Sequence, residues 1–473
     1  MWTLGGAVVG RLPDQRPHRR RPRQALVGAI NTSLVGGNDL AWGGKAVYVR
    51  KTAGGSSARR WACLGAWFLG GCGTVDGLVE PDRSTSTLSL TTLGIDGTST
   101  YWESDPNNVF ENAEFVDLGA ASLVVRGRVN DPDDVDVYDF GPVQPGDRIV
   151  VEMTTADSLD GVIALFDDTG ASLLINDHRN VYLGRSEPFV DLVVRRPSDS
   201  CWLAVSATPG YATSGDYVLV ASKGTSVPLR EHRPDVVLLD FEGSSNVRIG
   251  SRQAIEVPRF DAGRISPDLG ARQTQAMIDL IVAAVRDDYA GFDVQILSTS
   301  EGSRYDSSMS RLFFGADDDA LLGVAEGVDE FNSDPQQEAI VFADTFSAFL
   351  RLDPSVSELA QAIANVASHE IGHLLGLVHT KDPAGLMDVT ASLRALMRDQ
   401  SFRKSSIYSA VFPIGFQDAV QSLLDTVGGD PFFARVKEFA ADQQKVALEN
   451  DANPTPARTQ SRLSLCGVGR RPM

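Results

Sequence analysis

The chain has 473 residues, which is too long for one ordinary domain and fits two or three. Apolar residues make up 42% of it and charged residues 22%, which excludes wholesale disorder, collagen-like repetition and coiled coil. The formal charge of −19 is unevenly spread: residues 1–72 carry eleven Lys and Arg against two Asp, so the remainder stands at −28. Residues 73–473 are so acidic that they repel the phosphate backbone of nucleic acids, and nucleic acid is therefore excluded as a partner.

The first hundred residues are typical of targeting sequence and linker. Residues 1–48 are basic and then Gly-rich without periodicity, and we expect a disordered extension or a start codon assigned too far upstream. Residues 49–72 follow the layout of a secretory signal, in which basic residues precede a short apolar stretch and small residues. Residues 73–100 are rich in Ser and Thr, which is typical of a linker.

The end of the predicted signal, Leu69-Gly-Gly-Cys72, resembles the bacterial lipobox. This resemblance implies that the Cys72 thiol is lipidated and becomes the mature N-terminus. It predicts a protein of the bacterial cell envelope, lipid-anchored to the membrane and facing outward or into the periplasm, or otherwise a secreted one. The alternative is a buried Gly-rich segment with a core cysteine.

Residues 101–224 contain short apolar runs separated by turn residues such as Pro145-Gly-Asp147. Regularly spaced strands of this kind predict an all-β sandwich. Cys201, in an apolar run beside Trp202, is predicted to be a core residue. The predicted strands lie at 122–126, 148–153, 161–166, 189–194, 201–205 and 216–220.

The same stretch resembles the bacterial pre-peptidase C-terminal domain. The resemblance rests on Asp105-Pro-Asn-Asn108, on the run from Asp134 to Phe140, on Pro145-Gly-Asp147 and on Ser214-Gly-Asp-Tyr217. It implies a jelly-roll-like sandwich that accompanies secreted peptidases and in some cases binds calcium or substrate. The module usually follows the peptidase, whereas here it comes first.

Four acidic residues cluster in this region: Asp131, Asp133, Asp134 and Asp136. Their oxygens could supply the hard ligands that Ca²⁺ needs. The run contains no Gly-bearing twelve-residue calcium loop, so we favour a solvated loop whose charges keep a sheet edge from pairing. Ca²⁺ binding remains the alternative.

Residues 233–430 alternate between helix and strand patterns. One amphipathic helix is predicted from Leu269 to Tyr289, and a second begins near Ser355, where Glu358 completes a capping box. This order predicts an α/β domain with one twisted mixed sheet on two main helices. For residues 431–473 we expect a polar helix followed by a disordered tail. The predicted strands of this domain lie at 235–240, 292–297, 311–314, 321–325 and 339–342.

Three of the six histidines fall within eleven residues, as His369, His373 and His379. Histidines at i and i+4 project from one helical face, close enough to ligate one ion. Gly376 lets the chain leave the helix with positive φ and return His379 to the same ion. Glu370 lies next to the first ligand, where it can reach a metal-bound water without ligating. Five residues at these spacings arise by chance in roughly one chain in several thousand, so we reject an ordinary helix with surface histidines.

The run from His369 to His379 resembles the signature of the metzincin zinc peptidases, and Gly385-Leu-Met-Asp388 resembles their Met-turn at the short spacing of the matrixin branch. The resemblance implies a zincin-type domain whose active-site helix carries two of three histidine ligands to one catalytic Zn²⁺. It implies that Met387 forms the apolar floor beneath the imidazoles. It also implies that Leu321–Ala325 is the edge strand along which a peptide aligns, and that Phe416–Leu424 is the final helix.

The sequence therefore predicts an exported, membrane-tethered zinc endopeptidase in which Glu370 acts as general base on a zinc-activated water. Its substrate would be a protein or peptide. The alternative is a cell-surface binding module, similar to an adhesin, with a structural or inactive metal site. Intact Glu370 argues against this alternative, because a structural site has no use for a base there. His178 and His232 lie in polar loop contexts and are predicted to be surface residues.

Overall fold

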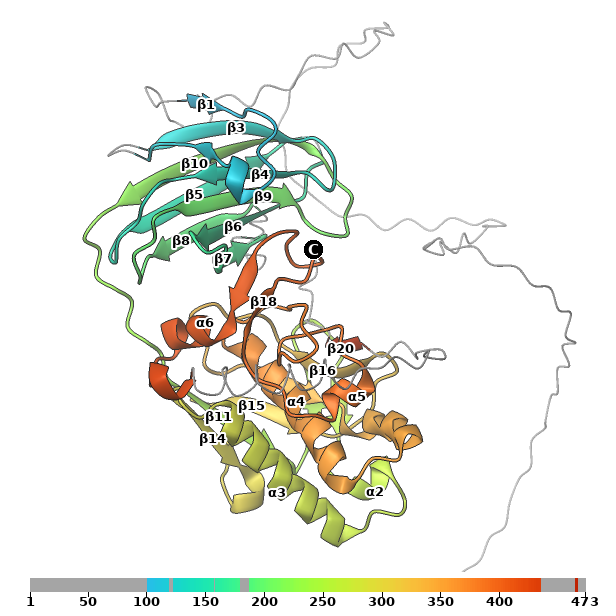
Figure 1. Ribbon diagram of the computed structural model, residues 1–473. Coiled ribbons are helices and arrows are strands. Elements are labelled where there is room, and N and C mark those ends of the chain that lie inside the picture. Colours follow the sequence, from blue (N-terminus) through green and yellow to red (C-terminus); the bar gives the residue numbers. More distant parts are fainter. Residues whose placement is uncertain (1–99, 119–121, 157, 179–186, 435–463, 467–473) are drawn as a thin grey trace, which may run out of the picture. The chain divides into compact units, whose positions relative to one another are not determined.

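The computed structural model describes residues 100–118, 122–156, 158–178, 187–434 and 464–466 (Figure 1). The predictions for residues 1–99, including lipidation of Cys72, and most of those for residues 431–473 lie outside these ranges. In the part of the chain that is described, no helix combines the length and apolarity needed to cross a bilayer.

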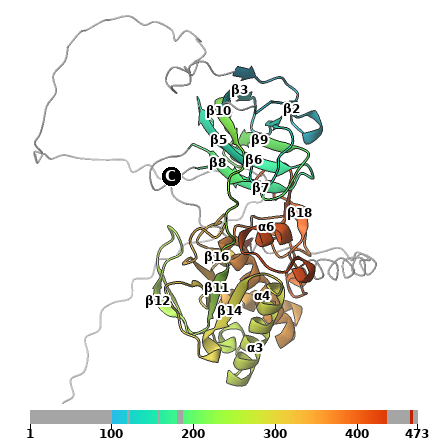
Figure 2. The same cartoon turned by 90° about the vertical axis from the view of Figure 1, so that its left-hand side faces the viewer.

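Residues 100–224 form a sandwich of two five-stranded sheets, ordered β1-β3-β10-β5-β8 and β2-β4-β9-β6-β7 (Figure 2). The predicted all-β fold is confirmed, and every predicted strand is present. The strands are β1 (Thr100–Trp102), β2 (Glu114–Phe115), β3 (Leu123–Val129), β4 (Val135–Asp139), β5 (Arg148–Thr155), β6 (Gly161–Asp167), β7 (Ser172–Asn176), β8 (Phe189–Val193), β9 (Cys201–Ala207) and β10 (Gly215–Gly224), with a 3-10 turn η1 (Phe110–Asn112).

The core of the sandwich consists of inward-facing residues from both sheets, such as Val125, Leu219, Ile163 and Leu203, which are all fully buried. Cys201 is among them, as predicted, and burial raises the pKa of its thiol to about 12. A thiol with so high a pKa carries almost no thiolate at neutral pH, so Cys201 is a packing residue without reactivity.

The second domain, which we call the helix–sheet domain, is built on a six-stranded sheet with the order β14-β11-β15-β17-β16-β20. Strands β14, β11, β15 and β17 pair in parallel, whereas β16 runs antiparallel to β17. The strands of this sheet are β11 (Asp235–Asp240), β14 (Val294–Ser298), β15 (Ser310–Phe314), β16 (Leu321–Ala325), β17 (Glu338–Val341) and β20 (Ser464–Cys466). The predicted mixed sheet is therefore confirmed, with β20 as an unexpected additional strand.

Two long helices, α3 (Ala271–Asp288) and α4 (Val356–Leu374), pack together against one face of this sheet and share its main apolar core (Figure 2). A hairpin of β12 (Ser244–Val247) and β13 (Ile255–Val257) covers the other face through a second apolar cluster. The shorter elements are α2 (Ala262–Ile265), η3 (Thr299–Glu301), η4 (Ala343–Leu352), α5 (Leu393–Leu396), β18 (Lys404–Ser406), β19 (Phe416–Asp418) and α6 (Ala419–Thr426).

Helix α4 begins at the predicted capping box. The Ser355 hydroxyl accepts a hydrogen bond from the Glu358 amide, and the Glu358 carboxylate accepts one from the Ser355 amide at 2.7 Å. The expected final helix is partly wrong, because residues 416–418 form β19, which pairs with β18. Helix α6 starts only at Ala419, where the Asp418 side chain accepts a hydrogen bond from the Gln421 amide.

The segment that follows β18 packs on the outer face of the β2-β4-β9-β6-β7 sheet. Ile407 and Phe412 are buried in one apolar cluster with residues of that face, including Val137 and Phe166. The rings of Phe166 and Phe412 have centroids 5.7 Å apart. The backbone joins the two parts as well, because the Phe416 amide donates to the Gly170 carbonyl at 2.8 Å. The sandwich thus stabilises this segment of the helix–sheet domain by apolar packing and by a backbone hydrogen bond.

We predict that Phe412→Ala lowers the free energy of unfolding by about 3–5 kcal/mol, the usual cost of removing a buried aromatic ring. Urea unfolding followed by tryptophan fluorescence measures the change. Phe432→Ala is the matched control, because the Phe432 side chain is 71% exposed and its removal should cost less than about 0.5 kcal/mol. Equal effects of the two substitutions would contradict the role given to Phe412.

Candidate metal centre

The three histidines predicted to bind metal converge on one point. The Nε2 atom of His373 lies 3.1 Å from Nε2 of His369 and 3.0 Å from Nε2 of His379. Two nitrogen ligands that each lie about 2.0–2.1 Å from one Zn²⁺ at a tetrahedral angle are about 3.3–3.4 Å apart. The observed spacing is therefore close to what a single ion requires. The other two described histidines are remote: His178 lies beside Asp177, and His232 is exposed.

The tautomers of two of these rings follow from their hydrogen bonds. His369 donates from Nδ1 to the Leu386 carbonyl at 2.6 Å, and His373 donates from Nδ1 to the Leu377 carbonyl at 2.7 Å. A neutral imidazole that donates at Nδ1 presents a lone pair at Nε2. Two such lone pairs aimed at each other repel unless a cation lies between them. The donor set and its orientation thus fit a divalent ion that favours imidazole.

The surroundings keep the three imidazoles neutral. His369 and His373 are fully buried, and desolvation lowers the pKa of His369 to about 4 and that of His373 well below its usual value. Burial also lowers the pKa of His379, and the nearby His369 adds to this effect. Because metal binding requires deprotonated nitrogens, the cluster is ready to accept an ion at neutral pH.

Gly376 has the positive φ that the sequence predicted. Its φ is +92°, which lets the chain turn out of α4 and return His379 toward the other two rings. A Cβ at this position would lie 3.1 Å from the Asp329 carbonyl oxygen and 3.2 Å from the Glu330 Cα. The Asp329 amide donates to the His373 carbonyl at 3.0 Å, so the segment around Asp329 closes over the end of the helix.

Glu370 is fully buried between α4 and the neighbouring strand β16. A Cβ built on Gly323, in the middle of β16, would lie 2.3 Å from Oε1 of Glu370. The carboxylate therefore occupies the space that any other residue at position 323 would fill. The prediction that β16 is the edge strand is wrong in this structure, because β20 pairs with β16 and itself forms the edge of the sheet. No local pattern in the sequence indicated that Gly323 makes room for Glu370.

The turn that carries Met387 lies next to helix α4. Met387 is buried, and a Cβ at Gly372 would lie 2.6 Å from its sulfur. The preceding residue, Leu386, accepts the His369 hydrogen bond described above. The turn therefore has two functions, since its backbone orients one ligand ring while its methionine packs beside the helix between His369 and His373.

Sequence reasoning missed the residues that hold the third histidine in place. Gln417, which is 2% exposed, accepts from the Val378 amide at 2.7 Å and donates to the Val378 carbonyl at 3.0 Å. The His379 carbonyl accepts from the Tyr408 amide at 2.9 Å. Gln417 lies 38 positions beyond His379 in the printed sequence, and no local pattern connects them.

A second group of oxygen atoms lies in the sandwich, where carboxylates of Glu103, Asp105 and Asp136 come within 4.8 Å of one another. The solvated loop expected for the acidic run is wrong for Asp134 and Asp136, which are 6% and 0% exposed. Asp136 lies inside β4, where burial, then its contact with Glu103, raises the pKa of its carboxyl to about 9.

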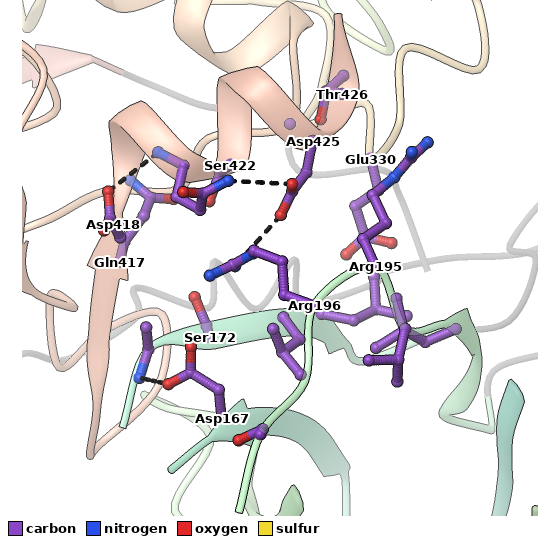
Figure 3. A pocket seen from close by; sticks show the side chains of 18 of the residues that line it. Asp167, Ser172, Arg195, Arg196, Glu330, Gln417, Asp418, Ser422, Asp425 and Thr426 are labelled. Atoms are coloured by element: carbon purple, nitrogen blue, oxygen red, sulfur yellow. Dashed lines mark hydrogen bonds and ion pairs between the residues drawn. The ribbon is translucent and has the colours of Figure 1, made fainter. Parts of the chain in front are cut away.

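A cavity of about 250 Å³ adjoins the segment that leads into His379 (Figure 3). Gly376 and Val378 line it, but none of the three histidines does. Across it, Arg196 pairs with Asp425 at 3.2 Å. Burial raises the pKa of Glu330, another lining residue, to about 8. No sequence pattern indicated this cavity, because its walls come from segments far apart in the chain.

Comparison with known proteins supports a zinc-dependent peptidase. The family model named Matrixin matches residues 309–404, which contain β15 to α5, the three histidines and Met387. The metzincin resemblance read from the sequence is confirmed over this segment. No match was found among curated proteins.

Similar solved structures include a pre-peptidase C-terminal domain of a collagenase from Bacillus anthracis, at 15% identity and a TM-score of 0.19, covering 25% of this chain and 100% of that one. Archaemetzincin from Methanopyrus kandleri is 18% identical with a TM-score of 0.21, and the coverage is 37% of this chain and 90% of that one. A zinc-dependent peptidase from Methanocorpusculum labreanum is 15% identical with a TM-score of 0.21, at 35% and 93% coverage.

We predict that Gly323→Ala abolishes most metal-dependent activity while zinc content stays unchanged, because the three atoms nearest to the added methyl group all belong to the Glu370 side chain, which the methyl group would displace. Zinc analysis together with a hydrolysis assay checks both halves of this expectation. Gly327→Ala is the matched control, since a Cβ there meets nothing within 4 Å. Normal activity in the Gly323 variant would show that the Glu370 position is not critical.

Proposed function

We propose that the protein is a zinc-dependent endopeptidase of the matrixin type, with the three-histidine cluster as its metal site. The observation that carries this proposal is the convergence of three neutral imidazole nitrogens next to a buried glutamate that does not belong to the cluster. His369, His373 and His379 would hold one catalytic Zn²⁺, and a position would remain open for water.

The bound ion would supply Lewis acidity, which polarises the scissile carbonyl and lowers the pKa of water toward about 7. Glu370 acts as general base: a carboxylate oxygen takes the proton of the attacking water and later passes it to the leaving amine nitrogen. Burial of Glu370 against Gly323 holds that carboxylate in one place. The hydrogen bonds from Nδ1 of His369 and His373 fix the two rings, so that their lone pairs stay directed at the ion.

The rival function is a binding module with a structural metal site. A structural zinc site is normally closed by four protein ligands. Within the described ranges the cluster contains three, and the neighbouring acidic residue is the buried Glu370. An open position beside a glutamate favours catalysis over a purely structural role.

We predict that Glu370→Gln reduces peptide hydrolysis by about 10²–10⁴-fold and leaves zinc content and fold unchanged, because it removes a proton acceptor and no ligand. His373→Ala should lose zinc together with activity. Casein or gelatin hydrolysis, metal analysis and circular dichroism measure the three properties. Near-normal hydrolysis by the Glu370 variant would refute the mechanism, and an inactive but zinc-loaded wild type would favour the binding module.

We also propose that Glu103, Asp105 and Asp136 form a Ca²⁺ site in the sandwich. Oδ2 of Asp136 accepts from the Tyr217 hydroxyl at 2.7 Å, whereas its buried Oδ1 accepts from no N–H or alcohol group of the described residues, and the side chain in contact with this carboxyl is that of Glu103. A buried carboxylate in this position needs either a proton or a cation. Oxygen ligands of this kind suit Ca²⁺.

We predict that Ca²⁺ raises the melting temperature of the protein at pH 7 and that Asp136→Asn abolishes this shift. The reason is that the ion replaces the proton which the Glu103–Asp136 pair otherwise keeps. Differential scanning fluorimetry with and without Ca²⁺ provides the measurement, and Asp133→Asn, at an exposed position outside the cluster, is the matched control. Identical shifts in all three proteins would place the ion elsewhere.

We further propose export with a lipid anchor at Cys72, which rests on the lipobox-like sequence alone. The mature chain should then begin at Cys72 and fractionate with membranes. Mass spectrometry of the membrane fraction should detect no peptide from residues 26–50, whereas abundant peptides from that segment would refute the anchor. Cys72→Ala should release the protein from the membrane fraction.

A further inference from the structure

Strand β20 occupies the edge of the sheet nearest the metal centre. It pairs with β16 in parallel, with Ser464 opposite Leu321 and Cys466 opposite Gly323. Strand β17 occupies the opposite edge of β16, through the pairs Gly323–Val341 to Ala325–Ala339. The backbone N–H and C=O groups on both sides of β16 therefore face a strand of the same chain.

The paired position lies next to the general base. Gly323 is the residue whose missing side chain makes room for Glu370, at a distance of 2.3 Å between a built Cβ and Oε1. Paired strands run about 4.7–4.9 Å apart, so the backbone of residue 466 passes within one strand spacing of this position. Residues of β20 also lie within 8 Å of α4, measured between Cα atoms. The added strand thus runs beside the helix that carries the metal ligands.

We propose that strand β20, residues 464–466, is an intramolecular ligand of the free side of β16 and inhibits the enzyme by occupying the place of an extended substrate. Binding of an extended peptide to a sheet edge uses the main-chain groups of that edge. Because β17 holds one side of β16, a substrate strand and β20 compete for the other side. The docking itself rests on the observed pairing, whereas the inhibition rests on the proposed peptidase function.

Covalent attachment makes even a short strand an effective competitor. Residue 464 follows the end of α6 by 38 positions, so its local concentration at β16 is on the order of millimolar. If the segment binds with a dissociation constant of about 0.1 mM, the fraction of open β16 edges falls about tenfold. A substrate that binds tightly or is abundant would displace it.

The test compares the full chain with a chain that ends after Gln460. Two properties are measured, namely hydrogen exchange of backbone amides and cleavage of a peptide substrate. Hydrogen exchange of the β16 amides that face β20 should quicken on the order of tenfold in the shortened chain, while the β11 amides keep their rates. Cleavage of a fluorogenic peptide should rise by a similar factor, and a synthetic peptide of residues 461–470 should reverse the gain. Leu465→Pro should mimic the truncation, because proline disrupts strand pairing, whereas Leu465→Ala should not.

The two readouts separate this proposal from the proposed function. Unchanged exchange of the β16 amides in the shortened chain would overturn the docking, whatever the activity. Faster exchange with no hydrolysis by either chain would support the docking and refute the peptidase. Faster exchange with equal hydrolysis by both chains would overturn the inhibition. Cys466→Ser should leave both readouts as in the full chain, and release of activity by this change alone would overturn a main-chain mechanism.

Discussion

The structure depends on one constraint, which is to hold Nε2 of His373 3.1 Å from Nε2 of His369 and 3.0 Å from Nε2 of His379, with the lone pairs of His369 and His373 directed at each other. The arrangement is repulsive without a cation, so the fold has to impose it. It does so with main-chain groups, which cannot rotate away as side chains can. The carbonyl oxygens of Leu386 and Leu377 orient two of the rings, and the Tyr408 amide holds the backbone of His379.

The three histidines of the cluster are held in place in different ways. His369 and His373 belong to α4, which is buried along almost its whole length and packs against both α3 and the sheet. His379 lies beyond the helix on a segment that relies on Gln417 and on the chain around Tyr408. That chain continues into Ile407 and Phe412, which pack on the sandwich. One histidine of the cluster therefore depends on packing that spans both domains.

The parts of the fold that could be predicted are those with a local signal. The capping box at Ser355, the i and i+4 histidines of α4, and the apolar runs of the sandwich depend on neighbours in sequence, and the structure contains each of them. The roles of Gly323 and Gln417 could not be predicted, because each depends on a partner far away in the chain. The acidic run was misjudged for the same reason, since pairing of β4 with β9 buries Asp136. The final helix was placed three residues too early because residues 416–418 found a strand partner in β18.

The packing of Phe412 on Phe166 has a thermodynamic consequence for the whole molecule. A ligand that binds only the folded state stabilises every part of the structure that must be folded for the site to exist. The segment that contains Tyr408 and Phe412 holds the backbone of His379 and packs on the β2-β4-β9-β6-β7 sheet of the sandwich. An ion at the histidine cluster would therefore stabilise that sheet as well, although it touches none of its atoms. Removal of metal would then loosen a domain that contributes no ligand, and the two domains would melt as one cooperative unit.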